Sequence, residues 1–333
     1  MMLKLEEIQK LNKTELHAHL GSMVTPDKLW EMAMVMGQKI PANNLPDFRD
    51  IIVGNGEPRQ IGHQAYLNKY FLTQRIQSSP KAIELSVYNS IVNAYVTDNV
   101  TDIEIRFNPM LRNQDGFYNL DAIIGSACIG VIRAMSIYPV NAGLIISTDR
   151  SFTPEQHLTL AKKTIKYAGK GVVGFDVSGA SPSDFKISDL LESYTLVRKS
   201  GIKTTIHTGE VPSVDISEME WVIENLQPNR IGHGIRSHKN QRILDMLVES
   251  KIHLEVCPVS NVKTGCVSSM SEIAKITHKF LEKGVSVSLN TDGVVFLNTT
   301  LSEQFLSVCD SIDQVKVLLN NAKENSFLAT IIN

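Results

Sequence analysis

The sequence has few of the residues on which disulfide-rich proteins depend. Among 333 residues there are four cysteines: Cys128, Cys257, Cys266 and Cys309. They are far apart in the chain and form no C-x-x-C pair, so the spacing offers no disulfide framework. A chain of this length buries enough apolar surface to need no disulfide. We therefore expect reduced thiols in buried, apolar positions, as in a cytoplasmic protein.

The sequence also lacks an excess of charge and a long apolar run. Its formal net charge is -2, which creates no strong field for nucleic acid or a membrane surface. Residues 1–13 (MMLKLEEIQKLNK) carry charges every few positions and lack the apolar core of a signal peptide. The longest uncharged, apolar-rich run, 122–132, is far shorter than the ~20 residues that span a bilayer. We expect a small-molecule partner, no nucleic-acid polymer and no membrane.

What the sequence does have is a regular alternation of strand and helix signals. Short β-branched runs with few polar residues are typical of parallel strands that are covered on both faces. These runs are residues 14–19, 102–107, 143–147, 172–177, 203–207, 230–233, 253–257 and 286–290. Between them lie helix signals, such as the capping box that Thr153 and Gln156 form around Pro154. This α/β pattern predicts either a parallel (β/α)8 barrel of the TIM type or a doubly wound sheet, and the pattern alone does not decide.

One interval is much longer than a single helix requires. Residues 20–101 separate the first strand from the second, and residues 38–64 within this interval are rich in Pro, Gly and Asn. Long insertions in barrels often form lids, so we expect residues 38–70 to cover the mouth of a barrel. No repeat, low-complexity tract or linker interrupts the chain. We therefore expect a single domain over residues 1–333.

Histidines occur at the ends of the expected strands. His17 and His19 are two positions apart on the first strand, so their side chains face the same side and supply half of a metal site. An isolated H-x-H is a weak signal, however, and also fits two unrelated histidines at a strand end. His207 ends the fifth strand and His233 ends the sixth, while Asp292 follows the eighth.

These strand ends are where barrel enzymes keep their active sites. Glu210 follows His207 closely, and glycines that allow close approach flank several of these positions. Three imidazoles and one carboxylate suit zinc with an open position for water. We interpret the other histidines as structural: His63, His157, His238, His253 and His278.

The chain resembles the adenosine deaminase family of metal-dependent amidohydrolases. The resemblance spans nearly the whole sequence and rests on the order and spacing of eight motifs. These are E-L-H-A-H-L (15–20), R-F-N-P (106–109), V-G-F-D-V-S-G (173–179), H-T-G-E (207–210), R-I-G-H-G (230–234), L-E-V-C-P-V-S-N (254–261), S-L-N-T-D (288–292) and S-F-L (326–328). It implies a TIM-type barrel and hydrolytic removal of the 6-amino group of an adenine-type purine.

The resemblance also implies roles for individual residues. The ligands of one zinc ion per chain would be His17, His19, His207 and Asp292. Glu210 would protonate the purine ring nitrogen beside the amino-bearing carbon, and His233 would orient the attacking hydroxide. Asp292 would in addition help to deprotonate the water. The residues at the substrate would include Gly179, whose N–H would meet a ring nitrogen, together with His19 and Gly293.

Some positions depart from the family pattern. The family usually presents an aspartate where this chain has Gly293, and an acidic or polar residue where it has Gly21, followed by Ser22. The acidic pair usual after Gly179 is replaced by Ala180 and Ser181. Loss of these side chains removes hydrogen bonds to plain adenosine, and we expect it to leave a roomier, less negative pocket. The substrate is then either a sugar-modified or phosphorylated adenosine, or adenosine held through Ser22 or a water.

Two further alternatives stay open. One is a deaminase of another amino-heterocycle, such as a pterin or free adenine. The other is a non-catalytic, ligand-binding relative, which is expected to lack a zinc ligand or the proton-shuttling glutamate. The presence of the complete set in this chain favours an enzyme.

Overall fold

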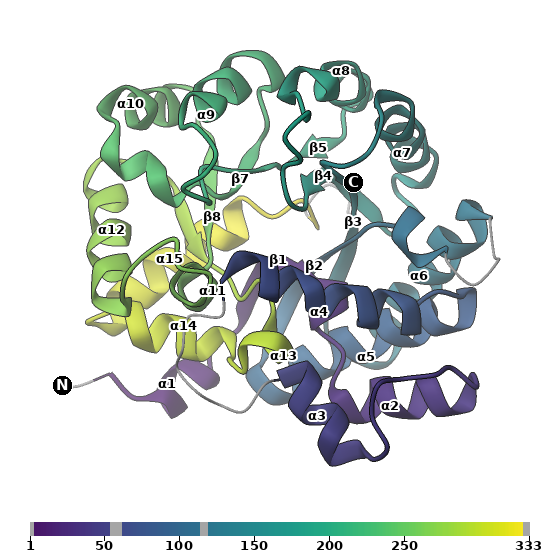
Figure 1. Cartoon of the computed structure of the whole chain (residues 1–333). Helices are drawn as coiled ribbons and strands as arrows, with labels where there is room; N and C mark the ends of the chain where they lie inside the picture. Colours follow the sequence, from purple (N-terminus) through teal and green to yellow (C-terminus); the bar gives the residue numbers. More distant parts are fainter. Residues whose placement is uncertain (1–2, 54–61, 114–118, 329–333) are drawn as a thin grey trace.

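The computed structural model describes residues 3–53, 62–113 and 119–328. All the predicted strands are present, and their ends differ from the predicted ones by small shifts. The strands are β1 (Lys13–His19), β2 (Val100–Phe107), β3 (Asn141–Asp149), β4 (Val172–Ser178), β5 (Lys203–Thr204), β6 (His207–Thr208), β7 (Arg230–His233), β8 (His253–Val256) and β9 (Val287–Leu289). All neighbouring pairs are parallel, and helices surround the strands (Figure 1).

Backbone hydrogen bonds close these strands into one barrel. The strands form two sheets, β1-β2-β3-β4-β5 and β6-β7-β8-β9, because the predicted fifth strand is split into β5 and β6. The ladder continues across the split, since Thr205 N donates to Phe175 O at 2.9 Å. At the other junction His19 N donates to Asp292 O at 3.1 Å and Asp292 N to His17 O at 2.9 Å. The TIM-type barrel is therefore confirmed over the doubly wound sheet.

The helices that follow the strands begin and end where the sequence predicts. Thr153 caps α7, with the reciprocal bond from its own N–H to the Gln156 side chain. Gly201 and Gly284 follow α8 and α12 with φ values of 77° and 76°, which suit glycine. From α5 onward the helices are α5 (Pro80–Asp98), α6 (Leu120–Ile137), α7 (Pro154–Tyr167), α8 (Leu191–Lys199), α9 (Ser217–Trp221), α10 (Gln241–Glu249), α11 (Pro258–Lys263), α12 (Met270–Glu282), α13 (Val294–Leu297), α14 (Leu301–Val308) and α15 (Ile312–Glu324).

The long interval between the first two strands forms helices beside the barrel mouth. These are the 3-10 turn η1 (Leu20–Ser22), α2 (Pro26–Val35), α3 (Leu45–Val53) and α4 (His63–Ile76), ahead of α5. They enclose a second apolar cluster that includes Phe48, Ile52 and Tyr66. In Figure 1, α4 crosses in front of the strands, whereas α2 and α3 lie to one side. Residues 54–61 of the predicted lid lie outside the described residues, and closure of a lid stays a prediction.

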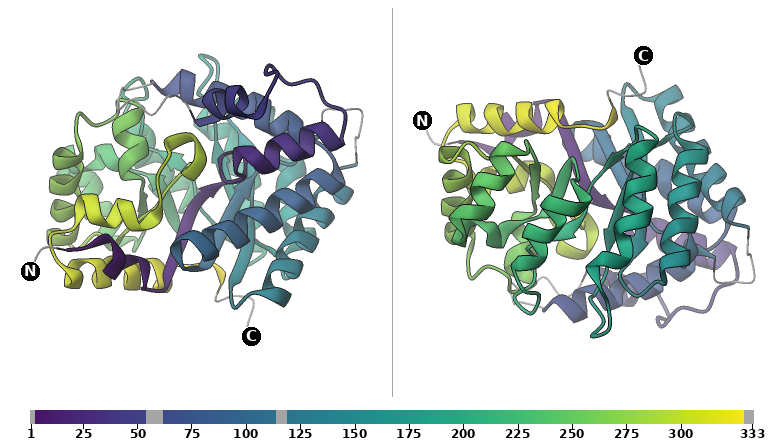
Figure 2. Two further views of the ribbon diagram at one scale, coloured as in Figure 1. Left: turned by 90° about the horizontal axis from the view of Figure 1, so that it is seen from below. Right: turned by 90° about the horizontal axis from the view of Figure 1, so that it is seen from above.

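The opposite end of the barrel is filled by the C-terminal segment. Phe327 and Leu328 pack with Ile145 and Val173 in a small apolar cluster. The Phe327 ring lies under the guanidinium of Arg230, 3.5 Å from the ring centroid. Figure 2 shows the same helical layer around the strands from two further sides. The segment therefore closes the end of the barrel remote from the predicted site.

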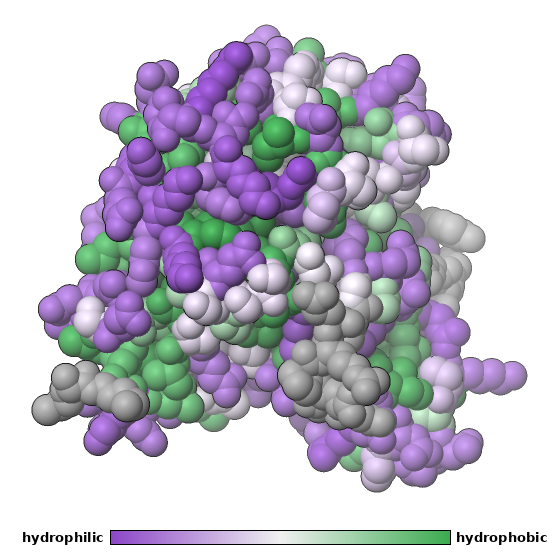
Figure 3. All heavy atoms as spheres, turned by 60° about the vertical axis from the view of Figure 1, so that its left-hand side comes forward, coloured by the Kyte–Doolittle hydropathy of each residue, from purple (hydrophilic) through white to green (hydrophobic). Residues whose placement is uncertain are grey.

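Helix α6 is apolar enough to cross a membrane by length and composition, with a mean hydropathy of 1.7 over 18 residues. The run found in the sequence is shorter because it stops before the charged Asp121 and Arg133. The buried side chains of α6 pack toward α5 and β3, and outer helices of barrels pass the same test. The helix is thus weak evidence for a membrane span, and the expected cytoplasmic location stays a prediction. On the face in Figure 3, hydrophilic residues predominate between small apolar patches.

The cysteines match their expected state in the described part of the chain. All four are free, with Cys128, Cys257 and Cys309 buried and Cys266 half-buried. Burial raises the pKa of the Cys128 thiol to about 11. These side chains therefore behave as small apolar groups.

Candidate active site

A pocket of about 530 Å³ lies at the C-terminal ends of the strands. The loops after β2, β3, β4 and β6 contribute to its wall, and α4 covers one side of it. This volume falls within the range of small-molecule sites. Most of the predicted site residues line the pocket, namely His19, Gly179, His207, Glu210, His233 and Asp292. The other two, His17 and Gly293, are buried behind its wall.

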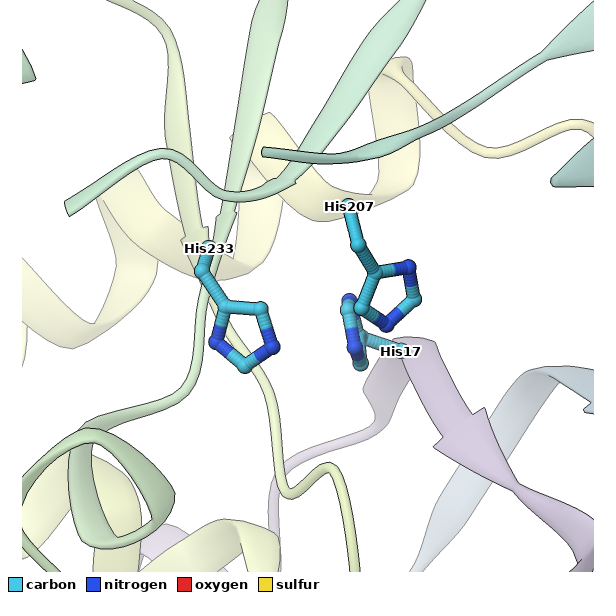
Figure 4. A group of neighbouring side chains, drawn as sticks. All are labelled: His17, His207 and His233. Carbon is cyan, nitrogen blue, oxygen red and sulfur yellow. The ribbon is translucent and has the colours of Figure 1, made fainter. Parts of the chain in front are cut away.

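The predicted metal ligands converge at the bottom of this pocket. His19 Nε2 lies 3.1 Å from His207 Nε2 and 3.3 Å from an Asp292 carboxylate oxygen. His17 Nε2 lies 3.8 Å from the same oxygen of Asp292. The ligand atoms of His17, His19 and Asp292 lie within 4.8 Å of one another, and so do those of His17, His207 and His233. Figure 4 shows the last three imidazoles, which converge from three strands.

The chemistry of this cluster fits a zinc ion. His17 is completely buried, yet its Nε2 has no hydrogen-bond partner among the described residues. A buried polar atom without a partner is costly, and a metal ion relieves that cost. Burial lowers the pKa values of His17, His19 and His207 well below the usual value, so the imidazoles are neutral. Neutral imidazole nitrogens and a carboxylate are the donors that zinc prefers.

Two buried carboxylates orient these imidazoles, and the sequence analysis assigned no role to either. Glu255 on β8 lies 2.7 Å from His17 Nδ1, and Asp176 on β4 lies 3.2 Å from His207 Nδ1. Each contact engages Nδ1 and leaves Nε2 to face the cluster, an arrangement typical of metal-binding histidines. Both residues belong to motifs that carry the family resemblance, and that was the only signal for them.

Arg106 holds the two carboxylates together. Its guanidinium donates to Glu255 at 2.7 Å and to Asp176 at 3.3 Å. Burial alone raises the pKa of Glu255, but Arg106 and Arg230 lower it to about 2. Burial raises the pKa of Asp176 to about 6. The interior of the barrel is therefore an ionic network that holds the imidazoles in place.

The backbone is strained at two of the site residues. His233 and Asp292 have φ values of 59° and 61°, a region that non-glycine residues seldom adopt. Two neighbours hold these side chains, since Ser260 donates to Asp292 Oδ2 at 2.6 Å and Asn261 Nδ2 lies 3.1 Å from His233 Nδ1. Strain of this kind persists where the surroundings impose it, and it concentrates at functional sites.

Glu210 is the carboxylate nearest to His233 on the pocket side. Its Oε2 lies 3.6 Å from His233 Nε2 and 4.0 Å from His63 Nε2. Burial raises the pKa of Glu210, although His63 and Arg150 oppose the shift. A glutamate with a raised pKa is suited to give and take protons at neutral pH. His63, which the sequence led us to interpret as structural, also lines the pocket.

The other histidines interpreted as structural lie outside the lining of this pocket in the described residues. His253 Nδ1 and Nε2 contact Ser286 and Ser288, both at 2.8 Å. His157 Nδ1 contacts Thr148 at 2.7 Å. Gly179, in contrast, lies at the pocket with φ 93°, and a Cβ there would overlap the Asp149 carboxylate. Glycine is therefore required at position 179.

Comparison with known proteins agrees with this geometry. The family model for adenosine deaminase matches residues 12–330. The chain belongs to the adenosine deaminase family. An adenosine deaminase of Clostridium kluyveri is 32% identical over 98% of this chain and 92% of its own length. The chain is therefore a hydrolase of C–N bonds in cyclic amidines, as its family is.

Solved structures show the same fold at lower identity. A zinc-bound amidohydrolase from Burkholderia ambifaria has a TM-score of 0.85 and 20% identity, covering 98% of this chain and 89% of that one. An N6-methyl-AMP deaminase from Arabidopsis has a TM-score of 0.82 and 24% identity, covering 97% of this chain and 95% of that one. At these identities the likeness concerns the fold alone.

The expectation that Gly21 and Gly293 leave the pocket roomier is wrong. A Cβ on Gly293 would overlap the Tyr66 hydroxyl, and a Cβ on Gly21 would lie 2.5 Å from the Tyr70 ring. The two hydroxyls are 3.1 Å apart, and that of Tyr70 donates to Ser22 Oγ at 3.2 Å. Tyrosines of α4 thus fill the space where adenosine deaminase family members usually have acidic or polar side chains. The space beside both glycines is therefore occupied, and the expectation of a less negative pocket stays a prediction.

Gly293→Asp introduces the aspartate that is usual in the family, but we expect this variant to be less stable and no more active on adenosine. The new side chain overlaps Tyr66, and overpacking of this kind costs about 1–3 kcal/mol. Urea unfolding of Gly293→Asp measures this loss, and kcat/KM for adenosine should not rise. The double variant Tyr66→Phe, Gly293→Asp removes the overlapping hydroxyl and should recover part of the stability. A stable Gly293→Asp protein with higher kcat/KM for adenosine would contradict the assignment.

Proposed function

We propose that this protein is a zinc-dependent enzyme that hydrolytically deaminates an adenine nucleoside or nucleotide to the 6-oxopurine and ammonia. The observation that carries the proposal is the cluster of imidazoles and a carboxylate around the unpartnered His17 Nε2, in one pocket with Glu210 and His233. The names of the relatives support it, since they include adenosine deaminases and an N6-methyl-AMP deaminase. The zinc in the Burkholderia ambifaria structure supports the choice of metal.

The residues that would hold the metal are His17, His19, His207 and Asp292. Zinc in such a site lowers the pKa of water and so supplies a nucleophile at neutral pH. Asp292 accepts a proton from the attacking water, while Ser260 holds its second oxygen at 2.6 Å. His233 points Nε2 toward the same space and orients the nucleophile. Glu255 and Asp176 keep the imidazoles in place through their Nδ1 atoms.

Protons are moved on the purine side by Glu210. In its protonated form, the buried carboxyl donates to the ring nitrogen beside the amino-bearing carbon, which makes that carbon electrophilic. Water adds to the carbon, the amino nitrogen gains a proton, and ammonia leaves as the 6-oxo group forms. Gly179 offers its N–H to a ring nitrogen on the far side of the base. Its φ of 93° places backbone, without a side chain, against the pocket.

A second reaction class and an inactive relative make different predictions. A pterin or free-adenine deaminase releases ammonia from those compounds and not from adenosine or its phosphates. A non-catalytic relative binds purine and releases none. The complete set of ligands together with Glu210 favours catalysis on a purine.

Metal analysis and an ammonia assay on a panel of amino-heterocycles test the proposal. We expect about one zinc per chain and ammonia release from adenosine or an adenosine phosphate. The panel contains adenosine, adenosine monophosphates, free adenine and a pterin. If only adenine or the pterin is turned over, the proposed substrate class is wrong and that compound takes its place. Metal-loaded protein that is inactive on the whole panel would refute the proposal.

A further inference from the structure

Arg112, at the end of the 3-10 turn η2 (Met110–Arg112), is a buried cation without a carboxylate partner. Its side chain lines the active-site pocket and is only 3% exposed. Nη1 donates to Asn108 O and Nη2 to Gln77 Oε1, both at 3.3 Å, and Nε has no partner among the described residues. No carboxylate of the described chain lies within 4.0 Å of it.

This situation sets Arg112 apart from the other arginines with comparable burial. Arg106, Arg150 and Arg230 each donate to a carboxylate, at 2.7, 2.8 and 2.5 Å respectively. Desolvation of an unpaired charge is unfavourable by several kcal/mol. Burial lowers the pKa of Arg112 to about 10, so the guanidinium is still charged at neutral pH. The described protein provides no anion to compensate this charge.

A second unpartnered donor lies beside Arg112 in the pocket wall. Asn108 is 5% exposed, and its Nδ2 makes no hydrogen bond among the described residues. Its Oδ1 accepts from Met110 N at 2.9 Å and from Leu111 N, which identifies Nδ2 as the free end. Two buried donors that lack acceptors, one of them on a cationic side chain, have the hydrogen-bonding character that suits an anion with several oxygens.

The carboxylates that line the same pocket are those of Asp149, Glu210, Glu218 and Asp292, and none of them lies within 4.0 Å of the Arg112 guanidinium. Tyr70 and Gln74, which line the same pocket, carry no charge at neutral pH, since burial raises the pKa of Tyr70. Position 21, usually acidic or polar in this family, is a glycine here and is covered by the Tyr70 ring. The Gln77 side chain bridges Arg112 to Leu20 O at 3.2 Å. The donors are therefore linked to the backbone next to His19, at the metal-binding end of β1.

We infer that Arg112 and Asn108 form an anion subsite of the active-site pocket, which binds the phosphate group of a purine nucleoside monophosphate. The guanidinium and the amide donate to phosphate oxygens while the base lies between Glu210 and the imidazole cluster. Phosphate has enough acceptor oxygens for both donors at once, which a neutral sugar hydroxyl lacks. The inference deepens the proposed function and rests on it for the position of the base.

The inference is tested with Arg112→Gln and steady-state kinetics on adenosine and its 2′-, 3′- and 5′-monophosphates. Loss of a charged hydrogen bond should lower kcat/KM for the preferred monophosphate about 10–100-fold, mainly through KM, and leave adenosine within about twofold. Arg112→Lys should recover part of the loss, because it restores the charge without the planar fork. The matched control is Arg133→Gln, because Arg133 is an exposed arginine of α6. This variant should leave kcat/KM unchanged for both adenosine and the monophosphate.

A binding measurement separates this inference from the proposed function. Inorganic phosphate should raise the Tm of the wild-type protein and compete with the monophosphate, and both effects should vanish in Arg112→Gln. Phosphate binding without deamination of any adenine compound would keep the subsite and refute the proposed function. Deamination of adenosine with no monophosphate preference, or an equal loss for adenosine and monophosphate in Arg112→Gln, would refute the subsite. Phosphate protection together with turnover of adenosine, but of no monophosphate, would show a free anion rather than a substrate group and would refute the subsite.

Discussion

Glu210→Gln should keep its metal and fold and lower kcat by about 10²–10⁴-fold, the range of general acid–base catalysis. Glutamine has the same shape as glutamic acid but has no acidic proton to give to the ring nitrogen. Burial raises the pKa of Glu210, so the wild-type side chain carries that proton at neutral pH more often than an exposed glutamate does. Ammonia release under saturating substrate measures kcat, and metal analysis of the same sample measures zinc.

The matched control for this variant is Glu220→Gln. Glu220 lies on α9 outside the pocket, where its carboxylate accepts from Asn240 at 3.3 Å. The Glu220→Gln variant should retain wild-type turnover. A structural glutamate at position 210 would give near-normal kcat and a lower free energy of unfolding, the opposite of the expected result. Measuring both kcat and the free energy of unfolding of Glu210→Gln therefore decides between a catalytic and a structural role.

His17→Ala and Asp292→Asn should each lose most of the bound zinc and bring turnover down to the background rate. His17 is buried with its Nε2 directed at the cluster, and an Asp292 carboxylate oxygen lies 3.3 Å from His19 Nε2, so the first variant removes one of four donors and the second removes the only negative charge among them. Asp292→Asn preserves the volume of the side chain and therefore limits disruption of the fold. Zinc content after dialysis against a weak chelator, together with circular dichroism, separates metal loss from unfolding.

His233 provides the decisive comparison, because its ring nitrogen also lies within 4.8 Å of those of His17 and His207. If His233 orients the nucleophile and is not a ligand, His233→Ala keeps its zinc and loses turnover. If instead His233→Ala loses zinc and Asp292→Asn keeps it, the ligand set is His17, His207 and His233, and the assignment of Asp292 is wrong. His278→Ala, on α12 outside the pocket lining, should change neither quantity.

Local signals in the sequence predicted parallel strands alternating with helices and the positions of the candidate site residues, whereas the choice of a barrel came from the family resemblance. A parallel strand covered on both faces has a recognisable apolar composition, and β7 (Arg230–His233) agrees with its predicted bounds. Catalytic side chains of a barrel follow directly after strands, so His207 and His233 are predictable from their position in the chain. Glu210 and Asp292 were found in the same way.

Only the tertiary structure decided which residues surround these groups. The contact of Glu255 with His17 joins positions 238 residues apart, and it exists because β8 and β1 face the same barrel interior. The filling of the space beside Gly293 by Tyr66 likewise depends on how α4 packs over the mouth, and so does the lack, among the described residues, of a carboxylate within 4.0 Å of Arg112 on η2. The residue pattern of a strand predicts which face of the sheet a side chain lies on, but it does not predict which distant residue that side chain contacts. The positions of the candidate reacting groups were therefore predictable from the sequence, whereas the orientation of the imidazoles and the lining of the pocket wall depend on packing between distant segments.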